Sequence, residues 1–400
     1  MRSASTLLML MVGGGLAAGA QAPPPVLEPS PLVVPQDDPD LLRQPALRER
    51  LRKGPHAYFR FINARFTQLV CERLTGRLPP LPVATLHGDA HLEQYAVTER
   101  GRGLADFDDA SSGPALIDLA RFAVSIRLAI RERGWQGEEA PIAAFLSGYA
   151  AALRDRHTEA PPPSAVRRLS AGFERNRITC LGRAESLMEP LADGAAPSEA
   201  TLEKAAVLLG EAARRPTSFF HAKRVGALRI GIGSAADEKY LLRVEGPSRD
   251  PEDDVILEVK EVRKLPAAGC IRSEPGPTRI LVSQARIAYQ PFEYAGSLDL
   301  DGRHFWFFAW TDNYAELDIH RTLESVTELG EVAYDVGVQL GRGHPAEASS
   351  KEAERLRKAL LETFPGAGLY ALTAELADAV EAAWKQFSAS APPGVVGAPD

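Results

Sequence analysis

The chain has 400 residues, of which 45% are hydrophobic and 25% are charged. This composition is typical of a globular protein with room for two or three lobes. Lys and Arg number 46 against 53 Asp and Glu, and the net charge of −7 argues against a broadly basic nucleic-acid-binding protein. The same counts exclude collagen-like, coiled-coil and disulfide-dense classes.

Residues 1–20 have the pattern of a secretory signal peptide. Arg2 precedes an uncharged apolar run from Thr6 to Ala20, which ends in the small residues Ala18-Gly19-Ala20. The run is shorter than the roughly 20 residues that a membrane span needs, so no stable span is expected after cleavage. We therefore predict export to the periplasm or the extracellular space. The alternative, if this segment is not a signal peptide, is a cytoplasmic protein.

The rest of the chain divides into regions of different texture. Residues 21–45 are Pro-rich and aperiodic, which predicts an extended linker. Residues 46–215 predict a helical lobe that also contains two short strands, at 81–86 and 103–107. Residues 216–320 predict a β-rich lobe, with strand-like runs at 225–244, 254–262, 279–284 and 304–310. Residues 321–390 predict C-terminal helices and residues 391–400 a flexible tail.

The three cysteines, Cys71, Cys180 and Cys270, are too few and too dispersed for a thiolate metal site. In an oxidising compartment one pair can form a disulfide, but the spacing does not say which pair. The favoured interpretation is that all three are small buried hydrophobic residues.

Two acidic segments carry the strongest chemical signal. They are LHGDAHLEQYAV (86–97) and LADFDDASSGPALIDLARF (104–122), and each follows a short predicted strand. A hairpin of the two strands would bring both acidic loops to one end. Asp89 can then accept a proton from an attacking hydroxyl, while Asp106 holds a divalent metal with Gln94 as a neutral oxygen ligand. The alternative is a solvated acidic turn at 106–109, with His87 and His91 only ordering the loop.

A second group of candidates lies about 140 residues later. Gly231-Ile232-Gly233-Ser234 falls between strand-like runs, where glycines let backbone N–H groups approach a phosphate. Lys260 is the cation of the strand-like segment DVILEVKEV, as in lobes that grip ATP. The alternatives are an ordinary hairpin turn and an exposed edge-strand lysine paired with Glu258 or Glu261.

These motifs resemble those of a known family. HGDAHLEQ and ADFDDASSGPALIDLARF are similar to the HGDxHxxN and D-F/W-x-D-A…DLA motifs of aminoglycoside phosphotransferases and related kinase-like enzymes. Over roughly residues 50–345 the chain more closely resembles the bacterial domain-of-unknown-function family 2252, with further matching blocks at GPHAYFRF, GIGSAADEKYLLRVEG and VILEVKEV. The resemblance implies an α+β, protein-kinase-like fold. Because the catalytic-type loop precedes the glycine loop here, that fold would be circularly permuted.

The resemblance also implies roles for individual residues. Asp89 would be the base, Gln94 and Asp106 would bind Mg²⁺ or Mn²⁺ with help from Asp108, and Lys260 would contact the phosphates of ATP under a cover formed by Gly231, Gly233 and Ser234. Asp118 and Arg121, with His87 and His91, would support the loop. Arg60 would either brace the acidic loops or hold phosphate. The acceptor would be a small molecule or a protein, and no nucleic-acid partner is implied.

Three functions therefore stay open. The first is a metal-dependent phosphotransferase or nucleotide-binding protein. The second is a catalytically inert exported scaffold, which is favoured by Gln94 in place of Asn, since the longer side chain shifts the amide by about 1.5 Å, and by the scarcity of ATP outside the cell. The third is a metal-dependent hydrolase that uses His87, Asp89, His91 and Asp106 as ligands.

Overall fold

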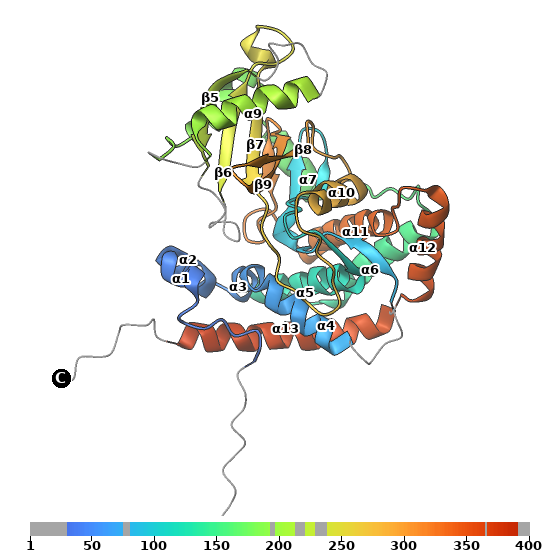
Figure 1. The fold of residues 1–400 in the computed structure, drawn as a ribbon. Helices are drawn as coiled ribbons and strands as arrows, with labels where there is room; N and C mark the ends of the chain where they lie inside the picture. The colour runs from blue at the N-terminus through green and yellow to red at the C-terminus, as the bar shows by residue number, and fades with distance from the viewer. Residues whose placement is uncertain are drawn as a thin grey trace, which may run out of the picture.

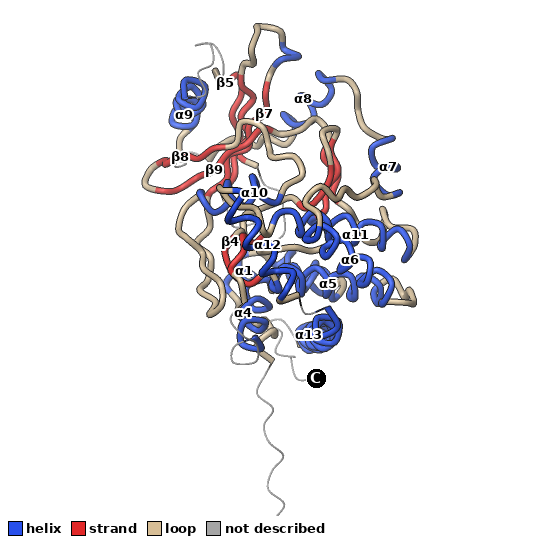
Figure 2. Tube along the Cα trace, turned by 90° about the vertical axis from the view of Figure 1, so that its right-hand side faces the viewer, coloured by secondary structure: helices blue, strands red, loops and turns tan. Residues whose placement is uncertain are grey.

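The computed structural model describes residues 30–74, 81–192, 197–212, 221–228, 238–364 and 366–390. The predicted signal peptide, the glycine segment Gly231, Gly233 and Ser234, and the predicted tail at 391–400 lie outside the described residues. The fold is mixed α+β, as the sequence predicts. A five-stranded sheet forms one end of the molecule and a helical body forms the other (Figures 1 and 2).

The helical body is built around α5 (Leu116–Glu132), most of whose residues are buried. Helices α6 (Glu139–Arg154), α11 (Val326–Gly343) and α13 (Gly366–Ala389) pack around it. α11 lies against α6 so closely that a Cβ at Gly337 would be 2.1 Å from the Phe145 carbonyl oxygen, so only glycine fits there. The remaining helices are α1 (Pro39–Arg43), α2 (Pro45–Arg52), α3 (Pro55–Phe61), α4 (Asn63–Leu74), α7 (Ser164–Ala171), α8 (Arg177–Ser186), α9 (Glu199–Ala212), α10 (Thr278–Ile287) and α12 (Ser350–Glu362).

The five-stranded sheet is antiparallel and has the order β5-β6-β7-β9-β8. Its strands are β5 (Ala222–Ala227), β6 (Lys239–Val244), β7 (Val255–Glu261), β8 (Gly296–Leu300) and β9 (Arg303–Ala309). β7 is the central strand, hydrogen-bonded to β6 on one side and β9 on the other. Lys260 is therefore 7% exposed, and the alternative of an exposed edge-strand lysine is wrong.

Two smaller sheets lie beside the helical body. β1 (Val83–Leu86) pairs with β4 (Ser111–Pro114), and β2 (Tyr95–Thr98) lies between β3 (Arg102–Leu104) and β10 (Tyr314–Glu316). The expected hairpin between 81–86 and 103–107 is thus wrong, because β3 pairs with β2 through a tight turn. In that turn the Thr98 hydroxyl accepts from the backbone N–H groups of Arg100 and Gly101.

Residues 279–284, which the sequence predicted as a strand, belong to helix α10. Ile280, Ser283 and Ile287 are buried at helical spacing, and the Ser283 hydroxyl donates to the Leu86 carbonyl, with 2.6 Å between the oxygens. The β-branched run therefore packs as one face of a helix against β1 and β4, because tertiary contacts outweigh its strand propensity.

The Pro-rich segment does not stay extended to residue 45. Leu32 and Val34 are buried, and α1 begins at Pro39. The Tyr58 hydroxyl donates to the Leu32 carbonyl and accepts from the Val34 N–H. From residue 30 onward the chain is therefore part of the helical body rather than a linker.

Cys71 and Cys270 form a disulfide with Cα atoms 5.2 Å apart, whereas Cys180 is free and buried. The interpretation of all three as buried thiols holds only for Cys180. The bond joins α4 to the segment before α10 across 199 residues, a proximity that sequence spacing does not reveal.

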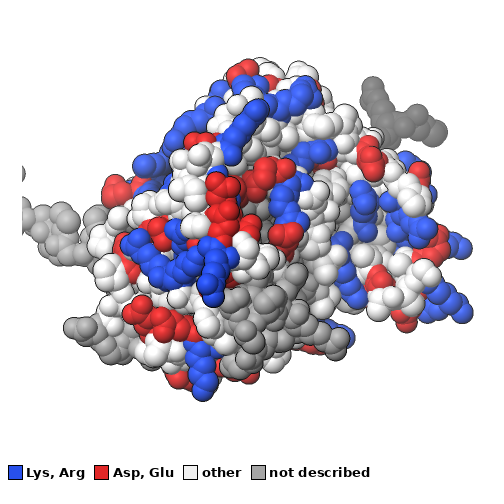
Figure 3. Space-filling view, turned by 90° about the horizontal axis from the view of Figure 1, so that it is seen from above, with Lys and Arg blue, Asp and Glu red and all other residues white. Residues whose placement is uncertain are grey.

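Among the described residues, no helix combines the length and apolar character needed to cross a bilayer. The face shown in Figure 3 carries basic and acidic side chains interspersed, rather than one continuous field of either sign.

Candidate functional site

The HGD turn follows β1, and a side chain of α5 binds its backbone. The Asp118 carboxylate accepts from the backbone N–H of His87, at 2.7 Å, and of Gly88, at 2.9 Å. Gly88 has φ +84°, and a Cβ there would lie 1.9 Å from the Asp109 carbonyl oxygen. The glycine thus lets the two acidic segments touch, and Asp118 has the contacts expected of a loop-supporting residue.

Asp89 is 9% exposed and both of its carboxylate oxygens are engaged. Arg121 Nε donates to Oδ1 at 2.6 Å, and the Gln94 amide donates to Oδ2 at 3.2 Å. Burial alone would raise the pKa of Asp89, but the charges of Arg121 and His91 bring it well below its usual range. Asp89 is therefore a carboxylate, able to accept a hydrogen bond or a proton.

The two histidines of the turn differ in their partners. His87 Nε2 lies 2.9 Å from the Ala105 carbonyl and its Nδ1 accepts from the Asp89 N–H, so this ring ties the two loops together. Because both ring nitrogens are engaged with backbone, His87 is poorly placed as a metal ligand. His91 Nε2 lies 3.6 Å from Asp89, beyond hydrogen-bond distance, and neither ring nitrogen has a hydrogen-bond partner among the described residues.

The DFDD turn contains a backbone outlier at Asp106, whose φ of 59° lies in the left-handed region. Such conformations are uncommon outside glycine and cluster at functional sites. The Asp106 side chain is 36% exposed, and its Oδ1 lies 3.3 Å from Lys260 Nζ. The turn therefore directs one carboxylate outward, toward solvent and toward the lysine of β7.

Asp108 lies deeper than Asp106. It forms an ion pair with Lys260, and its Oδ1 accepts from the Trp306 indole N–H at 3.0 Å. Burial and the charge of Asp106 raise the pKa of Asp108, whereas Lys260 outweighs the effect of burial on Asp106 and lowers the pKa of that carboxyl. Burial alone would lower the pKa of Lys260, but the two aspartates raise it, so the lysine stays charged.

Several residues outside the predicted set of site residues complete the site. Arg279 of α10 donates to the carbonyls of Asp108, Ala110 and Arg263. His344, at the end of α11, lies 3.1 Å from Asp118 Oδ2 and 3.1 Å from the Tyr149 hydroxyl. Trp306 is buried in the sheet, and its indole also donates to Asp108. In the sequence, His344 resembles a family position for which helix capping is the favoured interpretation, and it is the C-cap of α11. Arg279 begins a segment that is weakly similar to the family.

Two cavities meet at Asp106. The first, of about 610 Å³, is polar, and its wall includes Arg60, Asp89, His91, Gln94 and Asp109. The second, of about 510 Å³, lies between the sheet and α8, and its wall includes Lys260 and the aromatic residues Phe292, Trp306, Phe308, Trp310 and Tyr314. Asp106 and Glu316 line both cavities.

The predicted residues are thus largely brought together. Asp89, Gln94, Asp106, Asp108 and Lys260 lie around one junction, and His87, Asp118 and Arg121 hold its loops by hydrogen bonds. His91 lines the polar cavity, but its ring makes no hydrogen bond among the described residues. Arg60 ion-pairs with Glu93 at 2.7 Å and faces the polar cavity, where bracing and phosphate binding are both open to it. The glycine segment lies outside the described residues.

The oxygen donors suit a hard divalent cation such as Mg²⁺ or Mn²⁺. Asp106 is the accessible carboxylate, and the Gln94 side-chain carbonyl is a second donor. Asp108 is less available, because Lys260 and Trp306 hold its oxygens. Within the described parts of the chain, no three His, Cys, Asp or Glu side chains are grouped as a metal site, so any cation here needs the Gln94 amide, substrate oxygens or water.

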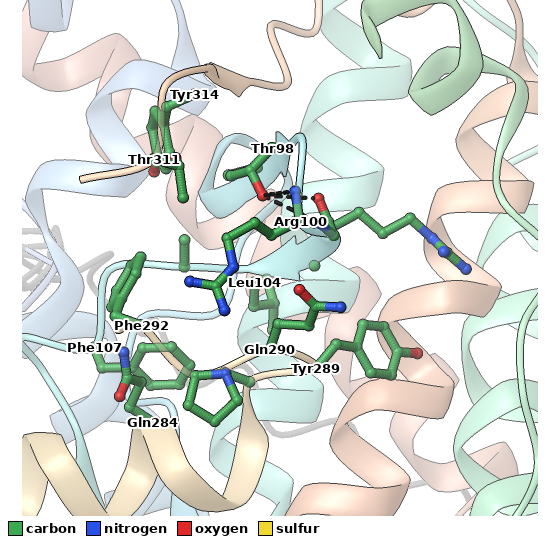
Figure 4. A pocket seen from close by; sticks show the side chains of 17 residues that line it. Thr98, Arg100, Leu104, Phe107, Gln284, Tyr289, Gln290, Phe292, Thr311 and Tyr314 are labelled. Atoms are coloured by element: carbon green, nitrogen blue, oxygen red, sulfur yellow. Dashed lines mark hydrogen bonds between the residues drawn. The ribbon is translucent and has the colours of Figure 1, made fainter. Parts of the chain in front are cut away.

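A third, smaller cavity of about 50 Å³ lies against the β2–β3 hairpin and contains none of the predicted site residues (Figure 4). Its wall includes Arg100, Tyr289, Gln290 and Gln284, and the buried Gln284 amide nitrogen has no hydrogen-bond partner in the part of the chain that the structure describes. A space of this size suits a few ordered waters, which would satisfy that nitrogen.

Comparison with known proteins identifies a family but no function. A search of curated proteins and a search of solved structures each gave no match. The model of the family described as "uncharacterized protein conserved in bacteria (DUF2252)" matches residues 39–195 and 174–390. These ranges cover most of the chain, including both acidic turns and Lys260, and the chain therefore belongs to the DUF2252 family.

Proposed function

We propose that the protein is a metal-dependent phosphotransferase with a permuted kinase-like site. The observation that carries the proposal is that Lys260 contacts both Asp106 and Asp108. Lys260 follows Asp106 by 154 residues, so the fold brings together two distant parts of the chain. Kinases use a strand lysine to place the phosphates and an aspartate from another part of the chain to hold the cation, and Lys260 and Asp106 could fill these two roles.

The strand order supports the same proposal. In kinases a glycine-rich loop joins the first two strands of the small sheet and the phosphate-binding lysine lies on the third. Here the GxGS segment falls in sequence between β5 and β6, and Lys260 lies on β7, the third strand of the sheet in chain order. The position of the lysine within the sheet therefore supports the proposal.

The two cavities suit the two substrates. The aromatic cavity beside Lys260 offers flat apolar surfaces for a nucleotide base, and the polar cavity beside Asp89 offers room for an acceptor. In the transfer, Asp89 accepts the proton of the acceptor hydroxyl while the hydroxyl oxygen forms a bond to the terminal phosphorus of the nucleotide. The bond from that phosphorus to the nucleoside diphosphate breaks, and Lys260 stabilises the negative charge of the phosphates.

A divalent cation would be held by Asp106 and the Gln94 carbonyl, and it would neutralise charge on the phosphates. For this the Gln94 side chain must turn, because its amide nitrogen now donates to Asp89. That requirement makes Gln94 the residue where this chain departs most from the kinase-like pattern.

A catalytically inert scaffold is the second candidate, and one observation favours it. Arg121 and Gln94 occupy both oxygens of Asp89, so an acceptor hydroxyl has to displace one of them. Such a protein would bind a nucleotide or another ligand without turnover. The hydrolase is less well supported, because His87 commits both ring nitrogens to backbone.

We also propose that the protein is exported. The apolar N-terminal segment suggests a signal peptide, and the Cys71–Cys270 disulfide is of the kind that persists in oxidising compartments. Export implies that the phosphate donor is either ATP supplied outside the cytoplasm or another phosphorylated compound.

The test is a thermal-unfolding titration of the protein from Gln21 onward with Mg²⁺ and with Mg²⁺ plus ATP. Ligand at roughly 100 times its Kd should stabilise the fold by about 2.7 kcal/mol. The shift should be lost in Lys260→Met and in Asp106→Asn. Asp301→Asn is the matched control, because Asp301 also has a positive φ, of 50°, but lies in the exposed β8–β9 turn.

The outcomes separate the candidates. A shift with Mg²⁺ and ATP, followed by release of ADP when acceptors are added, supports the phosphotransferase. A shift without turnover by any acceptor supports the scaffold. Stabilisation by the cation alone that is lost in Asp106→Asn and kept in Lys260→Met favours the hydrolase.

A further inference from the structure

Most acids of the polar cavity have a partner within the protein. Asp89 pairs with Arg121, Asp106 with Lys260, and Asp109 lies 3.4 Å from Arg263. On the side formed by α1, the Asp38 carboxylate accepts from the Asp40 N–H and so caps the helix. Although the wall carries six acids and five Lys or Arg residues, four of its acids are therefore held by the protein itself.

Three of the cations in the same wall have no such partner. Within the described residues Arg50 and Lys264 make no hydrogen bond or ion pair, and Arg65 contacts only the Pro31 carbonyl, at 3.4 Å. Among the described residues, Arg50 Nε is buried from solvent without a hydrogen-bond partner, and a buried donor of this kind normally meets an acceptor. The Asp38 and Glu316 carboxylates of the same wall accept from a backbone N–H and from the Tyr314 hydroxyl rather than from a cation. The three cations outnumber these two acids, so positive charge predominates among the groups without an opposite charge.

The three cations come from different parts of the chain, α2, α4 and the segment after β7. They converge on the cavity that contains Asp89, and its 610 Å³ falls in the range of small-molecule sites. Unpartnered polar atoms of Asn63 and His91 face the same space, and they provide further contacts for a polar ligand.

From these observations we infer that the acceptor is a hydroxylated small molecule that carries an anionic group. The anionic group binds Arg50, Arg65 and Lys264, and a hydroxyl lies at Asp89. This inference rests on the proposed phosphotransferase for the role of Asp89, but the anion site itself depends only on the three cations.

The test uses one sugar ring in three charge states: glucose, glucose 6-phosphate and glucosamine. Calorimetric titration at fixed ionic strength should show glucose 6-phosphate binding about tenfold more tightly than glucose, as expected for two or three partly exposed ion pairs. Glucosamine should bind most weakly. In Arg50→Gln/Lys264→Gln the advantage of the phosphate should disappear.

Arg321→Gln/Lys358→Gln is the matched control, since it removes the same charge from side chains that are 86% and 77% exposed and line none of the three cavities above. Three results would overturn the inference. Glucosamine binds as tightly as glucose 6-phosphate, glucose 6-phosphate does not bind at tens of millimolar, or glucose 6-phosphate still binds more tightly than glucose in Arg50→Gln/Lys264→Gln. The Mg²⁺–ATP shift is measured on the same samples. If Mg²⁺ and ATP give no thermal shift but glucose 6-phosphate still binds more tightly than glucose, the phosphotransferase alone is refuted. If the shift is present and glucose 6-phosphate has no advantage over glucose, the anion site alone is refuted.

Discussion

At the scale of single residues, the site depends on pairs of opposite charges that are largely buried. Arg121 pairs with Asp89, whereas Lys260 is shared by Asp106 and Asp108. Arg121 is fully buried, stacks over Phe59 and is the main counter-charge of Asp89. A buried pair of this kind contributes little relative to an apolar pair, but breaking it leaves one charge uncompensated. The site should therefore be most sensitive to changes that remove one partner alone.

We expect Arg121→Met to destabilise the protein by about 3–5 kcal/mol, because it leaves the Asp89 carboxylate buried and unpaired. Urea unfolding measures the change. Addition of Asp89→Asn should restore part of the loss. Arg131→Met, at a partly exposed position of the same helix, should cost less than Arg121→Met, because water can solvate the carboxylates that it leaves. If Arg121→Met lowers the free energy of unfolding by less than about 1 kcal/mol, Asp89 has another counter-charge.

The buried histidines predict an acid sensitivity. Burial is the main cause that lowers the pKa of His91, from 6.5 to about 4, and it also lowers the pKa of His56. Between these pH values the unfolded chain binds protons that the folded protein does not. The free energy of unfolding should therefore fall as pH drops from 6.5 to 4, on the order of 3 kcal/mol for His91.

Denaturant unfolding across this pH range checks the sign and the size. His91→Gln should flatten the dependence, whereas His157→Gln, at an exposed position, should leave it unchanged. A stability that rises on acidification, or a His91→Gln variant with the full slope, would contradict the assignment of a neutral buried ring.

At the scale of elements, α10 is the support that connects the acidic turn to the rest of the fold. Arg279 binds three backbone carbonyls and Ser283 binds a fourth, that of Leu86. The helix therefore fixes the DFDD turn and the end of β1 at the same time. It adds to the β1–β4 pairing and to the contact of His87 with Ala105, which also join the two acidic segments.

Arg279→Met should loosen the DFDD turn, because the Asp108 and Ala110 carbonyls lose their donor, at a cost of about 1–3 kcal/mol. Hydrogen exchange of residues 106–112 should become faster. Arg286→Met is the control on the same helix, since that side chain binds Thr85 and Glu347 instead. Unchanged exchange at 106–112 would mean that the turn is held without α10.

The sequence predicted elements where local periodicity and burial agree. The heptad-like spacing of Leu119, Phe122, Ile126 and Ile130 identified α5, and α11 was predicted in the same way. It predicted α10 as a strand, because RILVSQ is rich in branched residues and its helical burial pattern depends on contacts with β1. It also paired the wrong strands, since the short turn at Thr98 was not recognised as the closer hairpin.

The site followed the same division. Asp89, Asp106 and Lys260 were found from motifs whose chemistry is local. The role of Arg279 and the contact of His344 with Asp118 were not predicted, because each joins residues more than 150 positions apart in the chain. The Cys71–Cys270 pair was missed for the same reason, since only the tertiary fold brings α4 next to the segment before α10.

At the scale of the whole molecule, the disulfide closes a loop of 199 residues. Chain-entropy arguments assign a loop of this length about 5 kcal/mol of stabilisation. We expect Cys71→Ser/Cys270→Ser, or reduction of the native protein, to lower the melting temperature by several degrees and to weaken ligand binding in the polar cavity, since α4 and the 262–277 segment both contribute to its wall. Cys180→Ser should change neither property, and an equal effect of that variant would show that the bond has no special role.

The long separation between the acidic turn and its lysine has a consequence for biosynthesis. A chain made from its N-terminus presents Asp106, Asp108 and Asp109 well before β7 exists, because Lys260 follows Asp106 by 154 residues. Three neighbouring carboxylates repel one another and favour solvent over burial. The turn should thus remain hydrated on the ribosome, and the two cavities should form only when the sheet docks, so that assembly of the site is a late event in folding.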